Sequence, residues 1–162
     1  MADIDIRPYA KNDYESARKL FEELDERHRV AAPWMFESPR SEPRPPEYFD
    51  QLTASADAAI FVAVDRRTGS VAGLILLAVR EPPPIPVFIR QRWGVIDNIV
   101  VAAEHRRRGI GRRLLRTGEA WLKQAGVGFL DLNVYEFNEG ARAFYEAAGY
   151  LPVFTRMQKP LS

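Results

Sequence analysis

Hydrophobic spacing near the start of the chain changes from the period of a strand to that of a helix. Residues 3–8 alternate polar and apolar side chains, as a half-buried strand does. Asn12, with Glu15 three positions later, predicts a capping box. Apolar residues at helical spacing then continue to about His28, so we expect a strand followed by an amphipathic helix.

The middle of the chain predicts a short helix, a hairpin and a long strand. A helix is expected at 47–53, after an irregular segment rich in proline and aromatic residues. The apolar runs 58–64 and 71–80 flank a polar turn and predict a hairpin. The prolines of 81–86 lack the N–H groups of a central strand, so this segment is a loop. The β-branched run within 92–101 is typical of a buried strand.

The last third of the chain alternates helices and strands. A strong apolar stripe predicts a helix over 109–125, and a strand is expected at 128–135. Asn138 is placed to cap a helix over 139–148, and a last strand is expected at 150–158. Six strands and four helices in mixed order indicate an α/β protein.

Composition and charge narrow the class of protein. The chain has 162 residues, of which 46% are hydrophobic and 28% charged, so we expect one globular domain over 1–162. A net charge of +1 gives no overall field that would attract nucleic acid or a membrane. The absence of cysteine removes disulfides and a cysteine nucleophile, and two histidines argue against a metal centre. Without a signal-peptide or membrane-span pattern, a cytoplasmic location is expected.

The segment between the long strand and the following helix carries a candidate anion site. It reads Arg106-Arg107-Arg108-Gly109-Ile110-Gly111. Glycines let the backbone approach an anion closely, and the first N–H groups of a helix point at it. The pattern lacks the lysine of a Walker loop and the third glycine of a dinucleotide fingerprint. We therefore expect a phosphorylated ligand, and the local cluster of arginines suits a small polyphosphate.

The order of these elements, with Arg-x-x-Gly-x-Gly at its centre and the run from Asn138 to Tyr150 downstream, resembles the GCN5-related N-acetyltransferases. The resemblance is strongest from residue 92 to 150. It implies a mixed, mostly antiparallel sheet of about six to seven strands flanked by about four helices. It also implies acetyl transfer from acetyl-coenzyme A to a primary amine, by direct attack in a ternary complex and without a metal.

The resemblance assigns roles to single positions. Backbone amides of the arginine-glycine turn would hold the pyrophosphate, and the strand end would pair with the pantetheine arm and polarise the thioester carbonyl. Asn138 would contact the cofactor, although it is equally a plain helix cap. Tyr145 would be the general acid, because a phenol stays protonated at neutral pH and can donate to the leaving thiolate. The implied cofactor contacts are Ile99, Val100, Val101, Arg106, Arg107, Arg108, Gly109, Ile110, Gly111 and Asn138.

The general base stays open. Asp97 is the first candidate, because it lies on the strand before the turn and is expected to share its face with Ile99 and Val101. A strand aspartate that merely bonds to neighbouring backbone is the alternative reading. Glu104, His28 and deprotonation through water are the other candidates.

The acceptor and the assembly also stay open. The acceptor site is expected to form from the segments 22–36, 82–86 and the residues after Tyr150, and the amine and the strictness for acetyl are undetermined. An acyl-coenzyme-A-binding regulatory module would keep the fold without the chemistry. A nucleic-acid-binding module using the arginines is a third hypothesis, which the near-neutral charge disfavours. The resemblance is also compatible with a homodimer built on the C-terminal strand.

Overall fold

A mixed β sheet forms the centre of the computed structural model, which describes residues 3–159 and 161. In spatial order its strands are β1 (Ile4–Pro8), β2 (Ala58–Asp65), β3 (Val71–Arg80), β4 (Trp93–Val101) and β5 (Leu130–Leu132). The pairs β1–β2, β2–β3 and β3–β4 are antiparallel, and β5 runs parallel to β4. The mixed, mostly antiparallel α/β sheet is confirmed, but these residues form five strands, fewer than the six to seven expected.

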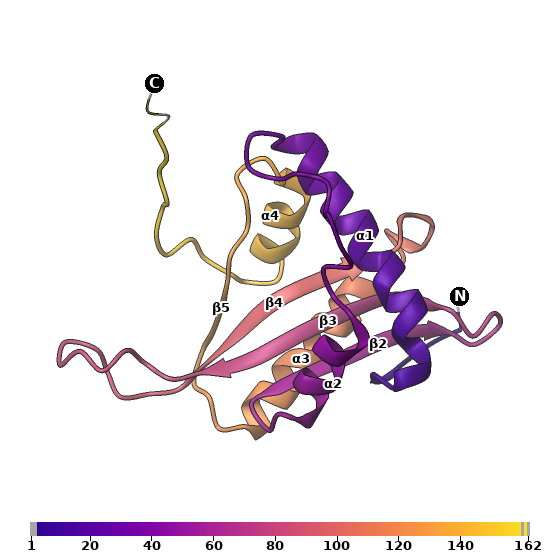
Figure 1. Ribbon diagram of the computed structural model, residues 1–162. Coiled ribbons are helices and arrows are strands. Elements are labelled where there is room, and N and C mark those ends of the chain that lie inside the picture. Colours follow the sequence, from indigo (N-terminus) through magenta and orange to yellow (C-terminus); the bar gives the residue numbers. More distant parts are fainter. Residues whose placement is uncertain (1–2, 160, 162) are drawn as a thin grey trace.

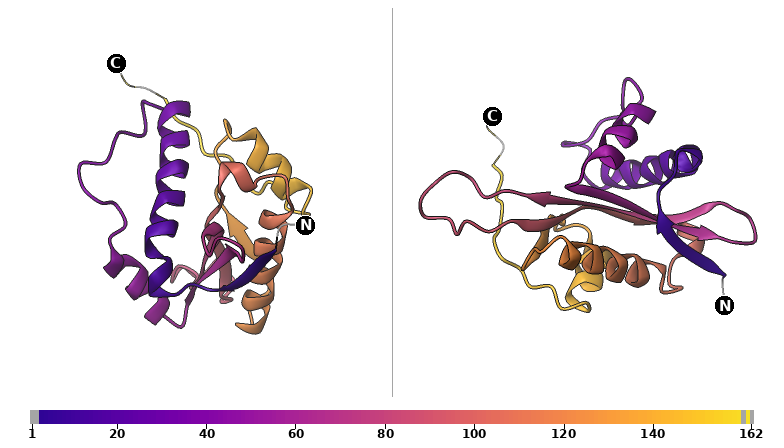
Figure 2. Two further views of the ribbon diagram at one scale, coloured as in Figure 1. Left: turned by 90° about the vertical axis from the view of Figure 1, so that its right-hand side faces the viewer. Right: turned by 90° about the horizontal axis from the view of Figure 1, so that it is seen from below.

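Helices cover both faces of the sheet, as the edge-on view in Figure 2 shows. One face carries α1 and α2, and the other carries α3 and α4. The helices are α1 (Tyr14–Ala31), α2 (Pro46–Ala54), α3 (Ile110–Gln124) and α4 (Glu139–Glu146), with short 3-10 turns η1 (Lys11–Asp13) and η2 (Ala103–His105). No helix within the described part of the chain has the length and apolar character that a membrane crossing needs.

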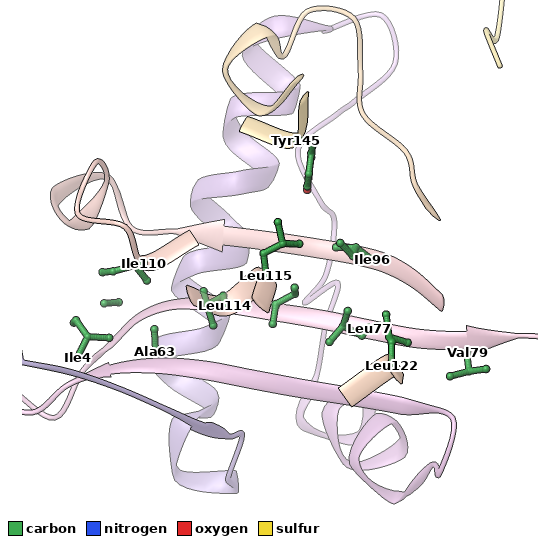
Figure 3. Packing of buried hydrophobic residues seen from close by; sticks show 12 residues of the cluster. Ile4, Ala63, Leu77, Val79, Ile96, Ile110, Leu114, Leu115, Leu122 and Tyr145 are labelled. Atoms are coloured by element: carbon green, nitrogen blue, oxygen red, sulfur yellow. The ribbon is translucent and has the colours of Figure 1, made fainter. Parts of the chain in front are cut away.

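Each face of the sheet has its own hydrophobic core. Leu77 of β3 and Leu114 of α3 belong to the core under α3 and α4, which is drawn in Figure 3. Phe21 of α1 and Leu74 of β3 belong to the core under α1 and α2. The strand β3 contributes to both, and all of its residues except Arg80 are buried. The strand β3 is therefore the buried centre of the sheet and joins the two cores.

The strand β4 carries one extra residue, Asp97. Asn98 pairs with Leu76 of β3, but the next β3 residue, Leu77, pairs with Ile96. Asp97 therefore has no partner across the ladder and forms a β-bulge. A bulge bends its strand and increases the local twist, so β4 changes direction at this point.

The bulge separates β4 from β5. The two strands pair only over Gly94–Ile96, and beyond it they diverge, as Figure 1 shows. Backbone groups alternate between the two edges of a strand, and the N–H of Ala102 donates to the carbonyl of Ala72 on the β3 side, at 2.9 Å. The N–H and C=O groups of Ile99 and Val101 therefore point to the open side between β4 and β5.

Two local expectations near the chain ends are wrong. The capping box of Asn12 and Glu15 does not form, because the Asp13 carboxylate instead accepts bonds from the Arg7 guanidinium and from the N–H of Ala10. The expected strand at 150–158 is absent, since these residues pair with no strand of the described chain. A segment that contains strand-forming residues does not by itself make a strand, because its N–H and C=O groups also need a neighbour.

Most other boundaries agree with the sequence. The hairpin of β2 and β3, the helix α2 and the cap of α4 by Asn138 are confirmed. The strand β5 is shorter than the expected 128–135, because β4 bends away after the bulge. The outer limits of the expected domain, residues 1 and 162, lie outside the described residues.

Candidate active site

The turn between β4 and α3 presents consecutive backbone N–H groups. Gly109, the N-cap of α3, has a φ of 78°, and Arg107, at 62°, is the only non-glycine residue in the described chain with a positive φ. Alternating left- and right-handed residues direct successive N–H groups into one concave surface. No acceptor for the N–H groups of residues 107–112 is found within residues 3–159. A backbone anion site needs this arrangement of N–H groups at the positive end of a helix.

The arginines of this turn have different surroundings. The Nε of Arg106 donates to the carbonyl of Val101 at 2.9 Å, and its Nη2 pairs with the carboxylate of Glu23 on α1. Arg107 and Arg108 are exposed and form no ion pair with any described residue. The guanidinium of Arg106 is thus bonded to other groups of the protein. The backbone of the turn and the side chains of Arg107 and Arg108 remain available to an anion.

The turn, the end of β4 and the helix α4 meet at Gly111. A Cβ atom at this glycine would lie 3.5 Å from the ring of Phe144 and 3.8 Å from the Cγ2 of Val101. The side chain of Phe144 leads directly to Tyr145, whose ring centroid lies 5.2 Å from its own. The turn and the predicted general acid are therefore parts of one region.

Tyr145 extends from α4 toward β4, with its hydroxyl oxygen at the end nearest the strand, as Figure 3 shows. The residue is 8% exposed and packs in the core with Ile96 and Leu115. Burial raises its pKa to about 12, because a phenolate would lose its hydration. Its hydroxyl bonds to no other group of the described chain. The phenol of Tyr145 is therefore a protonated hydrogen-bond donor that points toward β4, the strand that diverges from β5.

Asp97 does not share a face with Ile99 and Val101, contrary to expectation. Those two residues pack in the core under α3 and α4, whereas the extra residue of the bulge reverses the alternation and turns Asp97 to the opposite face. There its carboxylate lies 3.2 Å from the Nη2 of Arg80. Arg80 shares its face of β3 with Leu74 and Leu76, which belong to the core under α1 and α2, so its partner Asp97 lies on that face.

The other two candidate bases are His28, which lies among aromatic rings, and Glu104, which is exposed. The ring of His28 stacks on Phe36 at 5.3 Å and meets Tyr135 edge-on at 5.4 Å. Burial lowers the pKa of His28, since the imidazolium would lose water. A cavity of about 320 Å³ between α1 and the start of α4 includes His28 and Asn138 in its lining. Glu104 is exposed on η2.

Comparison with known proteins decides the family. Residues 14–150 match the acetyltransferase (GNAT) family. The chain belongs to this family. The GNAT assignment agrees with a 67-residue match, at 36% identity, to an uncharacterized N-acetyltransferase, YobR, from Bacillus subtilis (strain 168). That match covers 41% of this chain and 27% of YobR, so the chain corresponds to well under half of that relative.

Solved structures show the same GNAT fold. A mutant of the BH1408 protein from Bacillus halodurans aligns over 98% of this chain and 99% of its own, with a TM-score of 0.91 and 25% sequence identity. Glucosamine-6-phosphate N-acetyltransferase from Arabidopsis thaliana aligns over 98% and 99% of the two chains, with a TM-score of 0.72 and 17% identity. At that identity the second likeness concerns the fold alone.

The GNAT family normally uses acetyl-coenzyme A, and three features of this chain fit that molecule. The N–H groups of residues 107–112 suit a pyrophosphate. The outward backbone groups of Ile99 and Val101 suit an arm that carries amides. The hydroxyl of Tyr145 suits a leaving sulfur that needs a proton.

Two structural features near the candidate site could not be predicted from the sequence. The bulge at Asp97 has no signature in a run of β-branched residues, since the extra residue shows only against its partner strand. Glu23 lies on α1, far along the chain from the turn. Its contact with Arg106 joins positions 83 residues apart, and no local pattern predicts such a pair.

Proposed function

We propose that this GNAT-family chain transfers an acetyl group from acetyl-coenzyme A to a primary amine of a small molecule or peptide. The amine would attack directly in a ternary complex. The observation that carries the proposal is the open edge of β4, which has the N–H groups of residues 107–112 at one end and the hydroxyl of Tyr145 directed at the strand. Backbone donors and a phenol arranged along one edge suit a long ligand with an anion at one end and a thioester at the other.

The backbone of β4 would hold the pantetheine arm. Ile99 offers both an N–H and a C=O to the open side, while the C=O of Val101 already accepts from Arg106 at 2.9 Å. The N–H of Val101 remains directed to the open side of β4. An N–H on this edge would polarise the thioester carbonyl, because a fixed dipole stabilises the charge that develops on oxygen.

Tyr145 would act as the general acid. Bound acetyl-coenzyme A supplies the thioester, whose C–S bond breaks as the C–N bond to the amine forms. The departing sulfur takes the phenolic proton, and the amine nitrogen gives its excess proton to a base, so charge and protons balance. The raised pKa of Tyr145, about 12, keeps that proton on the phenol throughout the neutral range.

Asp97 is our proposal for the base. It lies at the point where β4 and β5 separate, on the face opposite the core that contains Tyr145. An acid on one face and a base on the other would let the amine enter from the α1 and α2 side while the thiolate leaves toward α4. His28, with its mainly aromatic neighbours, lacks a comparable position on the divided strands.

The proposed activity is tested by following thiol release from acetyl-coenzyme A with a panel of amines and peptides. Tyr145→Phe is expected to lower kcat about 100-fold or more, with the KM for acetyl-coenzyme A changed less than about threefold. Tyr9→Phe is the matched control, since Tyr9 is a packed tyrosine that stacks on Phe49 in the other core. Tight coenzyme A binding without thiol release from any acceptor would instead favour a regulatory acyl-coenzyme-A-binding module.

We also propose that the chain forms a homodimer through its C-terminal segment. Leu151, Val153, Phe154 and Met157 are between 75% and 88% exposed. The segment that carries them runs away from the sheet and its helices (Figure 1). A protein surface rarely leaves so many large apolar side chains in water, and a second copy of the chain would cover them.

A further inference from the structure

Glu23 of α1 reaches across to the anion-binding turn with both of its carboxylate oxygens. Its Oε1 pairs with the Nη2 of Arg106, and its Oε2 accepts from the N–H of Ala103 at 3.4 Å. The two charged side chains are each about one-third exposed, at 33% for Glu23 and 35% for Arg106. The carboxylate therefore connects α1 with η2 and the residue that begins the turn.

The same guanidinium connects α1 with the open edge of β4. Through its Nε, Arg106 donates to the carbonyl of Val101, one of the outward-facing groups of that edge, at 2.9 Å. The carboxylate on the far side of the guanidinium restricts Arg106 to this orientation, because both contacts use one rigid planar group. One ion pair thus fixes the last residue of β4 and the first residue of the turn.

We propose that Glu23 is a positioning residue for the acetyl-donor site. It holds Arg106 on the carbonyl of Val101, so that the turn keeps the left-handed backbone at Arg107 that directs its N–H groups together. Because this carbonyl is occupied, the pantetheine arm pairs with the remaining backbone groups of Ile99 and Val101. This inference rests on the function proposed above.

The helix α1 is itself held in place beside Glu23. Two positions further along, the carboxylate of Asp25 accepts two bonds from Arg44, at 2.6 and 3.1 Å. The guanidinium of Arg44 also lies over the ring of Phe21, 4.3 Å from its centroid. The segment before α2 and the core under α1 thus fix this part of the helix, so Glu23 acts from a rigid base.

Calorimetric titration with coenzyme A tests the proposal. Glu23→Gln and Arg106→Gln are each expected to weaken binding about 5- to 30-fold, the range for a charge-assisted bond that is partly screened by water. The double variant should bind about as weakly as either single variant, because both changes break one linkage. Glu26→Gln is the matched control, since Glu26 forms an exposed pair with Arg29 on the same helix.

A kinetic readout separates positioning from general stability. With saturating amine, Glu23→Gln should raise the KM for acetyl-coenzyme A by a factor similar to the loss of affinity and leave kcat within about twofold. Unchanged coenzyme A affinity in a folded Glu23→Gln protein would overturn the inference, and so would an equal loss in Glu26→Gln. If the unmodified protein binds no coenzyme A, the proposed function itself fails.

Discussion

At the scale of single residues, the burial of Tyr145 makes the free energy of unfolding depend on pH in the alkaline range. Its pKa rises from 10.0 to about 12 on folding, because burial penalises the phenolate. Folding therefore favours the protonated phenol, and its stabilisation is complete below the unfolded pKa near 10 and is lost as pH rises toward 12. Tyr9, whose pKa burial also raises to about 12, adds to the same loss.

Urea unfolding at pH 8, 10 and 11 measures this effect. We expect the free energy of unfolding to stay level up to about pH 10 and to fall above it. Tyr145→Phe should have a smaller alkaline loss than the unmodified chain, because one buried phenol no longer titrates. An equal slope in both proteins would contradict the assignment of the loss to this residue.

Asp97 gives a second prediction at the residue scale. If its carboxylate accepts the proton of the amine, Asp97→Asn should lower kcat about 100-fold or more while the KM for acetyl-coenzyme A changes less than about threefold. Asp57→Asn is the control, because Asp57 is another exposed carboxylate that pairs with an arginine, Arg92. Less than about a fivefold loss in Asp97→Asn would assign the deprotonation to water or another group.

The structural part that a residue plays could be predicted where it depends on the local backbone alone. Gly109 takes the left-handed conformation at the start of α3, and Asn138 accepts the N–H of Ala141 as an N-cap. The direction of Asp97 could not be predicted, because one extra residue in a ladder reverses the side-chain alternation without any change of composition. The contact of Glu23 depends on how α1 crosses the sheet, which no short pattern encodes.

At the scale of elements, the approach of α3 to β3 depends on Gly118. A Cβ atom there would lie 2.8 Å from the Cδ1 of Leu77 and 3.1 Å from the Cδ1 of Ile75, so Gly118→Ala forces these side chains to shift. Both are fully buried, and we expect the cost of repacking them to exceed the gain that alanine brings to a helix. We expect a loss of about 1–3 kcal/mol in the free energy of unfolding by urea denaturation.

Gly140→Ala on α4 is the matched control for this prediction. An added Cβ atom at Gly140 has no atom within 4 Å, and alanine favours a helix over glycine. This variant should be unchanged or stabilised by up to about 0.5 kcal/mol. Equal destabilisation of both variants would show that close helix–strand packing is not the cause.

The elements that the sequence predicted best have the strongest periodicity. The strands β3 and β4 and the helix α3 lie within a residue or two of their expected limits, because continuous apolar runs and a single apolar stripe leave little choice. The start of α1 was misplaced because Asp13 gains two bonds from Arg7 and one from Ala10, which outweigh a capping box one position earlier.

At the scale of the whole molecule, the exposed apolar segment after Tyr150 predicts self-association. Size-exclusion chromatography with light scattering should give the mass of a dimer for the full chain and of a monomer for a chain ending at Pro152. A full chain with the mass of a monomer at micromolar concentration would contradict the proposed dimer. Replacing Val153 and Phe154 by serine in the full chain should also give a monomer, which separates the loss of apolar contacts from the loss of length.

The left-handed turn at Arg107 and Gly109 has a consequence for how such a protein can diversify. If peptide groups rather than side chains bind the acetyl donor, then most residues of the turn can be substituted, provided that the φ and ψ angles of the backbone are kept. A β-branched residue at Gly109, for which a positive φ is costly, would do more harm than the loss of either exposed arginine. Changes in acceptor specificity would then accumulate on the α1 and α2 side of the sheet, where the amine is proposed to enter.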